Sequence, residues 1–285
     1  MAFEPVKETG GTLYVVATPI GNLDDMSLRA VKCLKEVHLI ACEDTRRTAR
    51  LLNHLGIKKP LISCFEHNEL ARIDELLEKI AAGESVALVS DAGTPTISDP
   101  GFALVRAAHE RGITVSPIPG PSAVIAALSV SGLPTDEFLF VGFLPRTSAA
   151  RRARLDQLKS QAATLILYES PHRALESLTD MIAILGDRAA FLAREVTKLH
   201  EETKSGALSE ILASLGARPE VLGEIVLVVA GAPEGASKSG SMEEALARFD
   251  AEVEMGGTPR QAAKAAALLT GLKARDIYSS AAARK

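Results

Sequence analysis

Short apolar runs rich in β-branched residues alternate with amphipathic stretches along the first 120 residues. Five of these runs predict strands, at residues 12–17, 39–42, 61–65, 85–90 and 114–118. The stretches between them predict helices, at residues 27–37, 48–55, 69–81 and 100–111. We expect Ser98 and Asp99 to cap the last of these helices, with Pro100 in its first turn. Because strands that alternate with helices are typical of a mostly parallel sheet buried on both faces, residues 11–120 predict an N-terminal α/β domain.

Three prolines between residues 117 and 121 end this rhythm, and the following elements are spaced less regularly. A helix of small residues is predicted at 122–130. Further strands are predicted at 137–143, 164–168, 189–194 and 224–230, and further helices at 147–160, 174–185 and 208–215. These elements predict a second α/β domain over residues 121–232.

A Gly/Ser-rich connector at residues 231–240 separates this domain from the C-terminal end. Helical patterns at 241–254, 259–269 and 273–283, with Gly271 in a turn, predict a helix-turn-helix-like tail over residues 241–285. From Gly256 onward the tail has six basic residues and one acidic residue, although the whole chain has a net charge of −4. The pattern is equally compatible with a helical hairpin that caps the core and with a nucleic-acid contact.

Composition excludes several classes of protein. The chain is 47% hydrophobic and 24% charged, which is typical of a globular protein and excludes a disordered one. Aromatic residues make up only 4%, with no Trp, which argues against a stacking platform for single-stranded nucleic acid. We expect a soluble cytoplasmic protein, because no signal peptide or membrane-length apolar run is visible. Cys33, Cys42 and Cys64 have no zinc-like spacing, so we expect buried free thiols and no metal site.

Loops rich in Pro and Gly follow three of the predicted strands, at residues 18–22, 91–101 and 119–123. The carboxyl ends of parallel strands meet at one edge of a sheet, which is where ligands bind in such folds. The sequence lacks a phosphate-binding P-loop, a dinucleotide-binding glycine pattern, a zinc-protease helix and a hydrolase nucleophile elbow. Three convergent loops therefore predict a small-ligand site of another kind.

Several segments, in order, resemble the ribosomal RNA small-subunit methyltransferase I family of the tetrapyrrole-methylase superfamily. They are VATPIGNLDD (16–25), SDAGTPTISDPG (90–101), PGPSA (119–123), YESPHR (168–173) and REVTKLHEE (194–202). The resemblance spans about residues 11–231, and the basic tail matches a helix-turn-helix appendage of that family. It implies a two-domain tetrapyrrole-methylase-like α/β fold that binds S-adenosylmethionine in the cleft between its domains, usually as a homodimer.

The resemblance also implies the reaction. The methyl group would go to the ribose 2′-oxygen of a cytidine in small-subunit (16S) ribosomal RNA, either free or in an assembled subunit. Methyl transfer from a sulfonium needs no metal but does need an aligned acceptor, helped by a general base or a cation. Residues 18–21 and 93–95 depart from the glycine-rich and Gly-Asp-Pro loops of many superfamily members, which argues against a porphyrin substrate.

The candidate site residues fall into three groups: the first is what the resemblance implies, the second consists of polar groups at strand ends of the second domain, and the third of basic residues that an RNA substrate would contact. The cofactor-binding group is Pro19, Ile20, Asp91, Ala92, Gly93, Thr94, Pro95, Ile97, Ser98, Pro121, Ser122, Ala123, Tyr168, Ala230, Gly231, Ala232 and Pro233. The catalytic candidates are Glu169, Arg194 and Glu195, with His172, Arg173 and Lys198 as further groups on the acceptor side. The RNA-binding candidates are Arg46, Arg47, Arg151, Arg154, Arg260, Lys264, Lys273 and Arg275.

Plainer interpretations of these residues stay open. Arg194 and Glu195 are equally compatible with an internal salt bridge, and Arg46 and Arg47 with ion pairs to the acidic residues before them. Three other functions also stay open: a corrinoid or porphyrin methyltransferase, a non-catalytic RNA-binding protein and a generic nucleotide-binding α/β protein. Binding of S-adenosylmethionine and dependence on an RNA acceptor would separate them.

Overall fold

The computed structural model describes residues 10–65, 69–233 and 242–284. The chain separates into two compact units, one with residues 1–130, 192–203 and 223–226 and the other with the remaining residues. The described residues form two five-stranded sheets. Within the described ranges, no helix is both long and apolar enough to cross a membrane.

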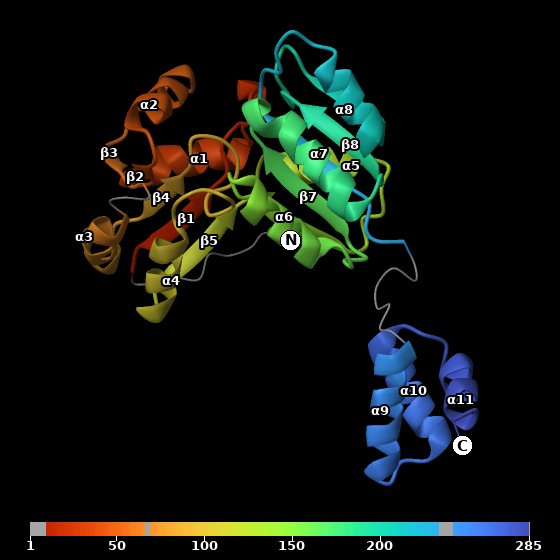
Figure 1. Cartoon of the computed structure of the whole chain (residues 1–285). Coiled ribbons are helices and arrows are strands. Elements are labelled where there is room, and N and C mark those ends of the chain that lie inside the picture. The colour runs from red at the N-terminus through yellow and green to blue at the C-terminus, as the bar shows by residue number, and fades with distance from the viewer. Residues whose placement is uncertain (1–9, 66–68, 234–241, 285) are drawn as a thin grey trace. The chain divides into compact units, whose positions relative to one another are not determined.

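The first sheet has the strand order β3-β2-β4-β1-β5, and its neighbouring strands pair in parallel (Figure 1). Its strands are β1 (Thr12–Val16), β2 (Leu39–Cys42), β3 (Leu61–Ser63), β4 (Val86–Val89) and β5 (Thr114–Ile118). Its helices are α1 (Leu28–Glu36), α2 (Thr45–His54), α3 (Glu69–Ala81) and α4 (Phe102–Glu110), followed by α5 (Ala123–Val130). The parallel α/β fold that the sequence predicts is confirmed.

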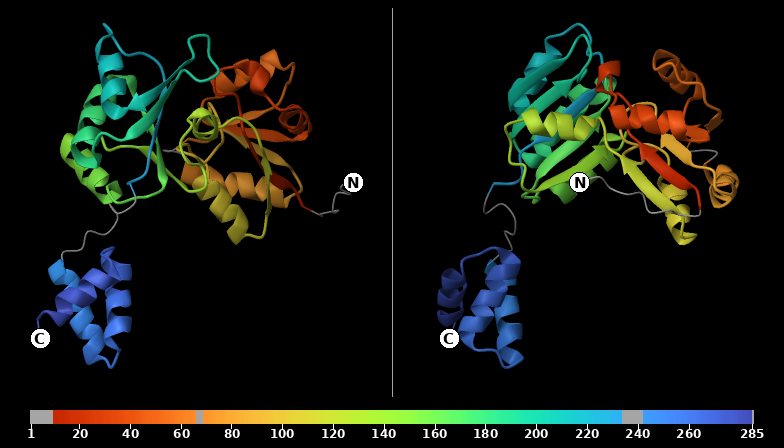
Figure 2. Two further views of the ribbon diagram at one scale, coloured as in Figure 1. Left: turned by 90° about the vertical axis from the view of Figure 1, so that its right-hand side faces the viewer. Right: turned by 180° about the vertical axis from the view of Figure 1, so that it is seen from behind.

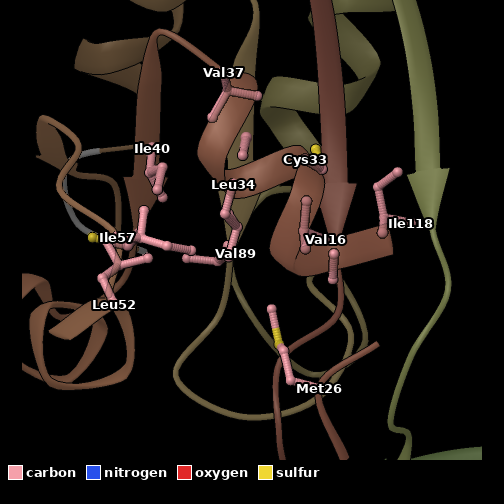
Figure 3. Packing of buried hydrophobic residues seen from close by; sticks show 13 residues of the cluster. Val16, Met26, Cys33, Leu34, Val37, Ile40, Leu52, Ile57, Val89 and Ile118 are labelled. Atoms are coloured by element: carbon pink, nitrogen blue, oxygen red, sulfur yellow. The ribbon is translucent and has the colours of Figure 1, made fainter. Parts of the chain in front are cut away.

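Successive residues of each central strand enter different hydrophobic clusters, because side chains alternate between the two faces of a sheet. Ile40 and Cys42 of β2 pack with Ala87 and Val89 of β4 in one cluster that includes residues of α1 and α2. Figure 3 shows Ile40 and Val89 of this cluster together with Leu34 of α1. The intervening residues of both strands pack with α3 and α4 in the opposite cluster, which contains Leu39, Ala41, Val86, Leu88, Leu76, Leu77 and Leu104. Both faces of the sheet are therefore covered by helices, so a ligand can reach the sheet only at the ends of its strands.

Two helix starts differ from the sequence prediction by more than one residue. Helix α2 begins at Thr45, earlier than expected, because the Asp44 carboxylate accepts the Arg46 N–H and caps the first turn. The prediction that Ser98 and Asp99 cap α4 is wrong. Helix α4 begins only at Phe102, and its N-cap is Gly101 in a left-handed conformation (φ 119°) with no side-chain cap. A glycine there takes a positive φ without steric cost.

The second sheet has the strand order β6-β7-β10-β8-β9. Its strands are β6 (Phe138–Phe143), β7 (Thr164–Glu169), β8 (Ala189–Arg194), β9 (Glu202–Ala207) and β10 (Ile225–Val229). The helices among them are α6 (Ser148–Leu158), α7 (Ala174–Leu185) and α8 (Leu208–Gly216). Strand β9 was not predicted, because its sequence ETKSGA has no apolar alternation and only its place at the end of the sheet makes it a strand.

Arg151 of α6 lies in the interior of the second unit, with only 2% of its side chain exposed. Its Nε donates to a carboxylate oxygen of Asp180 on α7 at 2.7 Å, and Ser148 and Arg152 donate to the same carboxylate at 3.1 Å. These donors outweigh burial and hold the pKa of Asp180 below its usual value. The sequence prediction that Arg151 contacts RNA is therefore not retained, because its guanidinium joins two helices.

The tail consists of three helices, α9 (Met242–Glu254), α10 (Pro259–Thr270) and α11 (Ala274–Ala282), which Figure 2 shows as one group. They share a hydrophobic cluster of their own, formed by Ala245, Leu246, Phe249, Ala262, Ala263, Ala266 and Ile277. Thr258 caps α10 in a capping box, and Gly271 ends it with φ 71°. The predicted Gly271 turn and its two helices are confirmed; most of the predicted connector lies outside the described residues.

We expect Arg151→Met to lower the free energy of unfolding by about 3 kcal/mol, because it leaves the buried Asp180 carboxylate without its main partner. Arg152→Met should cost about 1 kcal/mol or less, because the Arg152 side chain is 49% exposed and its ion pair is screened by water. Urea denaturation followed by circular dichroism measures both. Equal losses for the two variants would contradict the structural role of Arg151.

Candidate functional site

The loops after β1 and β4 are joined by a reciprocal pair of backbone hydrogen bonds. The Thr18 N–H donates to the Gly93 carbonyl at 2.8 Å, and the Gly93 N–H donates to the Thr18 carbonyl at 3.0 Å. The buried Thr18 hydroxyl also donates to the Ser90 carbonyl at 3.1 Å. These bonds hold the two loops side by side at the carboxyl edge of the first sheet.

The loop after β5 joins this pair. The Thr94 hydroxyl donates to the Pro121 carbonyl at 3.1 Å. Gly120 packs against the end of β1, since a Cβ built on it would lie 3.0 Å from the Cβ of Ala17. The prediction that three Pro/Gly loops converge is therefore confirmed, and it brings together the candidate cofactor-binding residues of this unit: Pro19, Ile20, Asp91, Ala92, Gly93, Thr94, Pro95, Ile97, Ser98, Pro121, Ser122 and Ala123.

The loop at residues 91–101 is held in backbone conformations that few residues adopt. Gly93 has φ 84°, and Thr96 and Ser98 have φ 75° and 64°. A positive φ is rare for residues with a Cβ, and rarest for a β-branched residue such as Thr. Strain of this kind persists where the surrounding structure enforces it, and it clusters at ligand sites and switches.

Acidic side chains gather at the ends of β2 and β4. The Asp91 carboxylate accepts the Asp44 N–H at 3.1 Å and pairs with Arg47 at 3.2 Å. Burial, and then the negative charge of Glu43, raise the pKa of Asp99 to about 6, against a hydrogen bond from Ser90 that lowers it. The pKa of Glu43 is also raised, first by burial and then by Asp91. This edge therefore favours a ligand that carries positive charge.

The sequence predicts Asp99 only as a helix cap and Glu43 only as a possible ion-pair partner of the arginines that follow it. Glu43 directly follows the predicted strand 39–42, and Asp99 lies in the Pro/Gly loop after the predicted strand 85–90; those positions were the available signal. Their mutual proximity depends on the pairing of β2 with β4, which are far apart in the sequence. No local pattern encodes that pairing.

Arg46 and Arg47, two of the RNA-binding candidates, both have acidic partners at this edge. Arg46 binds Asp44 at 2.7 Å and holds the pKa of that carboxyl well below its usual range. Arg47 pairs with Asp91. Their side chains are nevertheless 84% and 63% exposed, so their outer N–H groups face water and are available to a phosphate.

Tyr168 and Glu169 belong to the second unit, at the end of β7. The Tyr168 ring packs edge-on to Phe140 and against Phe143, with ring centroids 5.0 and 5.5 Å away. Glu169 is 2% exposed and accepts bonds from the Ser170 N–H, Arg173 and Ser177. A carboxylate so fully engaged supports the turn after β7 and does not present itself to a substrate.

The turn at residues 230–233 has extensive contacts inside the second unit. The Ala232 N–H donates to the Gln161 carbonyl at 2.6 Å, and Arg188 donates to the Ala230 carbonyl at 3.3 Å. A Cβ on Gly231 would lie 1.7 Å from the Ala162 carbonyl oxygen, so only glycine fits there. The structure thus gives this turn a packing role, and its cofactor contact stays a prediction.

Arg194 and Glu195 both have the salt-bridge partners that the plainer interpretation predicted. Arg194 at the end of β8 bonds Glu202 of β9 at 2.9 Å. The Glu195 carboxylate accepts a hydrogen bond from the Lys198 ammonium at 2.9 Å and another from the Glu224 N–H. These two bonds lower the pKa of Glu195. Glu195 also has φ 52° and lies with Lys198 in the first unit, beside the loops. The lowered pKa makes Glu195 a poor general base. Lys198 is the cation that these contacts hold beside the loops.

The remaining candidates are placed as follows. Arg154 is half-buried on α6, where it bonds Gln157 at 3.0 Å. Arg260, Lys264, Lys273 and Arg275 are all exposed on or beside α10 and α11. His172 is exposed in the turn Pro171–Arg173. In the part of the chain that the structure describes, no group of three or more His, Cys, Asp or Glu could hold a metal ion, and all three cysteines are buried free thiols.

Known proteins share both the sequence and the fold. A family model described as tetrapyrrole (corrin/porphyrin) methylases matches residues 12–212. The chain is 49% identical over 284 residues to the "Ribosomal RNA small subunit methyltransferase I" of Pseudomonas aeruginosa, covering 97% of this chain and 99% of that protein. The chain belongs to this methyltransferase I family, within the tetrapyrrole methylases. The resemblance carried by its five sequence segments is confirmed.

Two further comparisons bear on the length of the chain and on the fold. A protein of the same name from Thermotoga maritima is 49% identical over 221 residues, which are 78% of this chain and 99% of that protein. The solved structure of the methyltransferase CobJ covers 79% of this chain and 95% of its own, with a TM-score of 0.58 and 21% identity. That likeness shows the fold of the two sheets, and the shorter relative shows that family members differ in length.

We expect Asp99→Asn to stabilise the protein above pH 6 and to leave its stability near pH 4 unchanged. The folded-state pKa of about 6 exceeds the usual value, so the wild type loses stability as pH rises from about 4 to about 6 and the uncharged Asn does not. The melting temperature at pH 8 should rise by about 2 °C. Asp136→Asn, at an exposed loop position, is the control. A pH-independent effect of Asp99→Asn would contradict the raised pKa.

Proposed function

We propose that this protein transfers a methyl group from S-adenosylmethionine to the ribose 2′-oxygen of a cytidine in small-subunit (16S) ribosomal RNA. The observation that carries the proposal is the identity of 49% over nearly the full length of a relative whose name is that of a small-subunit ribosomal RNA methyltransferase. The three tied loops support it independently, because they form a rigid ligand-binding edge.

The residues of this edge fit S-adenosylmethionine. The loops offer backbone groups around Gly93 and Gly120, where a side chain would be strained or crowded. The carboxylates of Glu43, Asp91 and Asp99 suit a ligand with a positive charge. When bound, the cofactor supplies an electrophilic methyl group on a sulfonium, and the chain has to orient donor and acceptor in line. We assign the holding of the cofactor to Pro19, Ile20, Thr94, Ile97, Ser122 and Ala123.

The RNA acceptor is a polyanion, and exposed cations are available to it. Arg46 and Arg47 lie at the loop edge, and Arg260, Lys264, Lys273 and Arg275 lie on the tail. Phosphate contacts of this kind position an RNA without reading its sequence. We propose that these residues, with Arg154, bind the ribosomal RNA or the assembled small subunit. Homodimerisation and a cytoplasmic location are part of the same proposal and rest on the family resemblance.

A small-molecule corrinoid or porphyrin methyltransferase is the main alternative, since solved structures of that class share the fold. Their identity to this chain is low, at 21% for CobJ, and supports the fold alone. The loop sequences Thr18–Gly21 and Gly93–Pro95 also depart from the loops of many such enzymes. A methylated ribose in RNA is therefore the product to look for.

We expect small-subunit ribosomal RNA from a strain that lacks this gene to lose one 2′-O-methylated cytidine, which mass-spectrometric mapping of nuclease fragments detects. The wild-type gene should restore it. Gly93→Val should fail to restore it, because the positive φ of Gly93 and the nearby Ile20 leave no unstrained place for a branched side chain. Calorimetry should find at least about tenfold weaker cofactor binding to this variant, a loss of about 1.4 kcal/mol.

Val105→Ile on α4 provides a control for a conservative apolar enlargement away from the loops. Unchanged S-adenosylmethionine affinity in a folded Gly93→Val protein would remove the cofactor assignment of this loop. An unchanged set of ribose methylations in the deletion strain would reject the proposed function itself.

We expect removal of the tail after Gly240 to preserve S-adenosylmethionine affinity and to weaken RNA binding. Each phosphate that a basic residue binds releases counterions, so the log–log salt slope of RNA affinity should become shallower by about one for each phosphate bound by the tail. Helices α9–α11 share a hydrophobic cluster of their own, so the truncation removes this cluster as a whole and does not divide it. Filter binding across salt concentrations measures the slope, and an unchanged slope with a lower melting temperature would favour the capping interpretation instead.

A further inference from the structure

The segment at residues 195–198 is strained in the same way as the loop at 91–101. Within the described chain, four residues other than glycine have a positive φ: Thr96 and Ser98 in that loop, and Glu195 and Thr197 here, with φ 52° and 66°. All four belong to the first unit. The proposed cofactor contacts account for the first pair but not for the second.

Lys198 packs directly on the loop at residues 18–22, which follows β1. A Cβ built on Gly21 would lie 2.3 Å from Cγ of Lys198 and 3.2 Å from its Cε, so the aliphatic stem occupies the space that any other residue at position 21 would fill. The same Cβ would lie 3.0 Å from the Thr197 hydroxyl oxygen. Gly21 follows Pro19 and Ile20, two residues of the proposed cofactor site. The side chain of Lys198 therefore lies beside that site.

Two carboxylates orient the Lys198 ammonium. Its Nζ donates to Glu195 at 2.9 Å and to Glu224 at 3.0 Å. Glu195 is itself fixed, because its N–H donates to the Glu224 carbonyl and its carboxylate accepts the Glu224 N–H, both at 2.9 Å. Gly223 has φ 88°, and a Cβ there would lie 2.4 Å from Cγ of Glu195, so a side chain would displace this carboxylate. The positive φ of Glu195 thus serves to aim its side chain at Lys198.

The ammonium keeps capacity for a further bond. A lysine ammonium has three N–H donors, and the described residues accept two of them. The Lys198 side chain is 27% exposed, and the raised pKa of Lys198, in which the carboxylates outweigh burial, keeps it charged. Next to it the Thr197 hydroxyl is buried and, among the described residues, has no hydrogen-bond partner. The strained backbone and the unsatisfied hydroxyl both reduce stability, and the ammonium beside them is held in one orientation. This combination is typical of a functional site.

We propose that Lys198 donates its third N–H to the ribose 2′-oxygen that accepts the methyl group, held in place by Glu195, Glu224 and Gly21. The inference rests on the proposed function. In the reaction a lone pair of the 2′-oxygen forms the O–C bond to the methyl carbon, and the C–S bond breaks with its electron pair left on sulfur. The hydroxyl proton becomes strongly acidic as the O–C bond forms, so it passes to the exposed Glu224 carboxylate and then to water. Lys198 aligns the oxygen before this step.

The hydrogen bond from Lys198 to the 2′-oxygen is tested by measuring RNA binding, independently of catalytic turnover. The acceptor is an RNA fragment around the mapped cytidine, with either ribose or 2′-deoxyribose at that one nucleotide. With S-adenosylhomocysteine present, the wild type should bind the 2′-deoxy RNA about tenfold more weakly, since this RNA cannot accept the hydrogen bond from the ammonium. Lys198→Met keeps the stem on Gly21 but has no ammonium, so it should bind the two RNAs within about twofold of each other. Methylation by Lys198→Met should fall about 100-fold in kcat.

Matched variants separate this role from a structural one. Lys58→Met removes an exposed lysine from the same unit and should keep the tenfold difference. Lys198→Arg retains a cation and should restore part of the discrimination. Lys198→Leu, which also has no N–H donor, serves in place of Lys198→Met if the latter fails to fold by circular dichroism.

Failure of the role of Lys198 can be distinguished from failure of the proposed function. If the wild type methylates ribose but Lys198→Met still discriminates tenfold, or if the wild type does not discriminate at all, the role of Lys198 is overturned and the proposed function stands. If the wild type produces no ribose methylation in ribosomal RNA, the proposed function fails, and this inference fails with it.

Discussion

The pair of backbone hydrogen bonds between Thr18 and Gly93 is the constraint on which the candidate site depends. It joins the ends of two strands that are neighbours in the sheet, although the two residues lie 75 positions apart in the chain. Because it uses backbone groups, it demands a residue at position 93 that accepts φ 84°, and glycine does so without cost. The Thr94–Pro121 bond adds the third loop to this frame. A small ligand therefore meets a preformed edge rather than three mobile loops.

The parallel sheet explains why function is concentrated at that edge. Both faces of the sheet are covered, with α1 and α2 in one hydrophobic cluster and α3 and α4 in the other. Only the strand ends remain for polar chemistry, and the carboxyl ends of β1, β4 and β5 carry the three loops. The same edge gathers Glu43, Asp91 and Asp99, whose mutual repulsion in a partly buried setting is unfavourable for stability. Unfavourable charge and unfavourable backbone geometry at one place are typical of a binding site that stability alone would not select.

The sequence allowed the fold to be predicted wherever apolar periodicity was strong. Strands β2 and β5 and helices α3 and α7 were predicted with the bounds the structure has, because their apolar residues follow the period of the element. Strand β9 was missed because it is polar and stabilised by its neighbour. The start of α4 was misplaced because Pro100 and the residues before it have the local signature of a helix, whereas packing of Gly101 on Leu88 delays the helix to Phe102. Tertiary contact overrode local propensity there.

For charged residues, sequence alone did not separate support from function. Arg151 and Glu169 looked like surface chemistry, yet each is buried and bonded to partners from another element or turn. Lys198 looked no different in the sequence, yet its ammonium is partly exposed and its two carboxylates leave a donor unused. The difference is whether the charged side chain is enclosed or partly exposed, which depends on contacts between distant segments. A buried charge that is enclosed by its partners holds the fold together, whereas an oriented and partly exposed charge with an unused donor can act on a ligand. By that criterion we place the proposed acceptor chemistry at the segment of Lys198 rather than at Glu169 or Arg194.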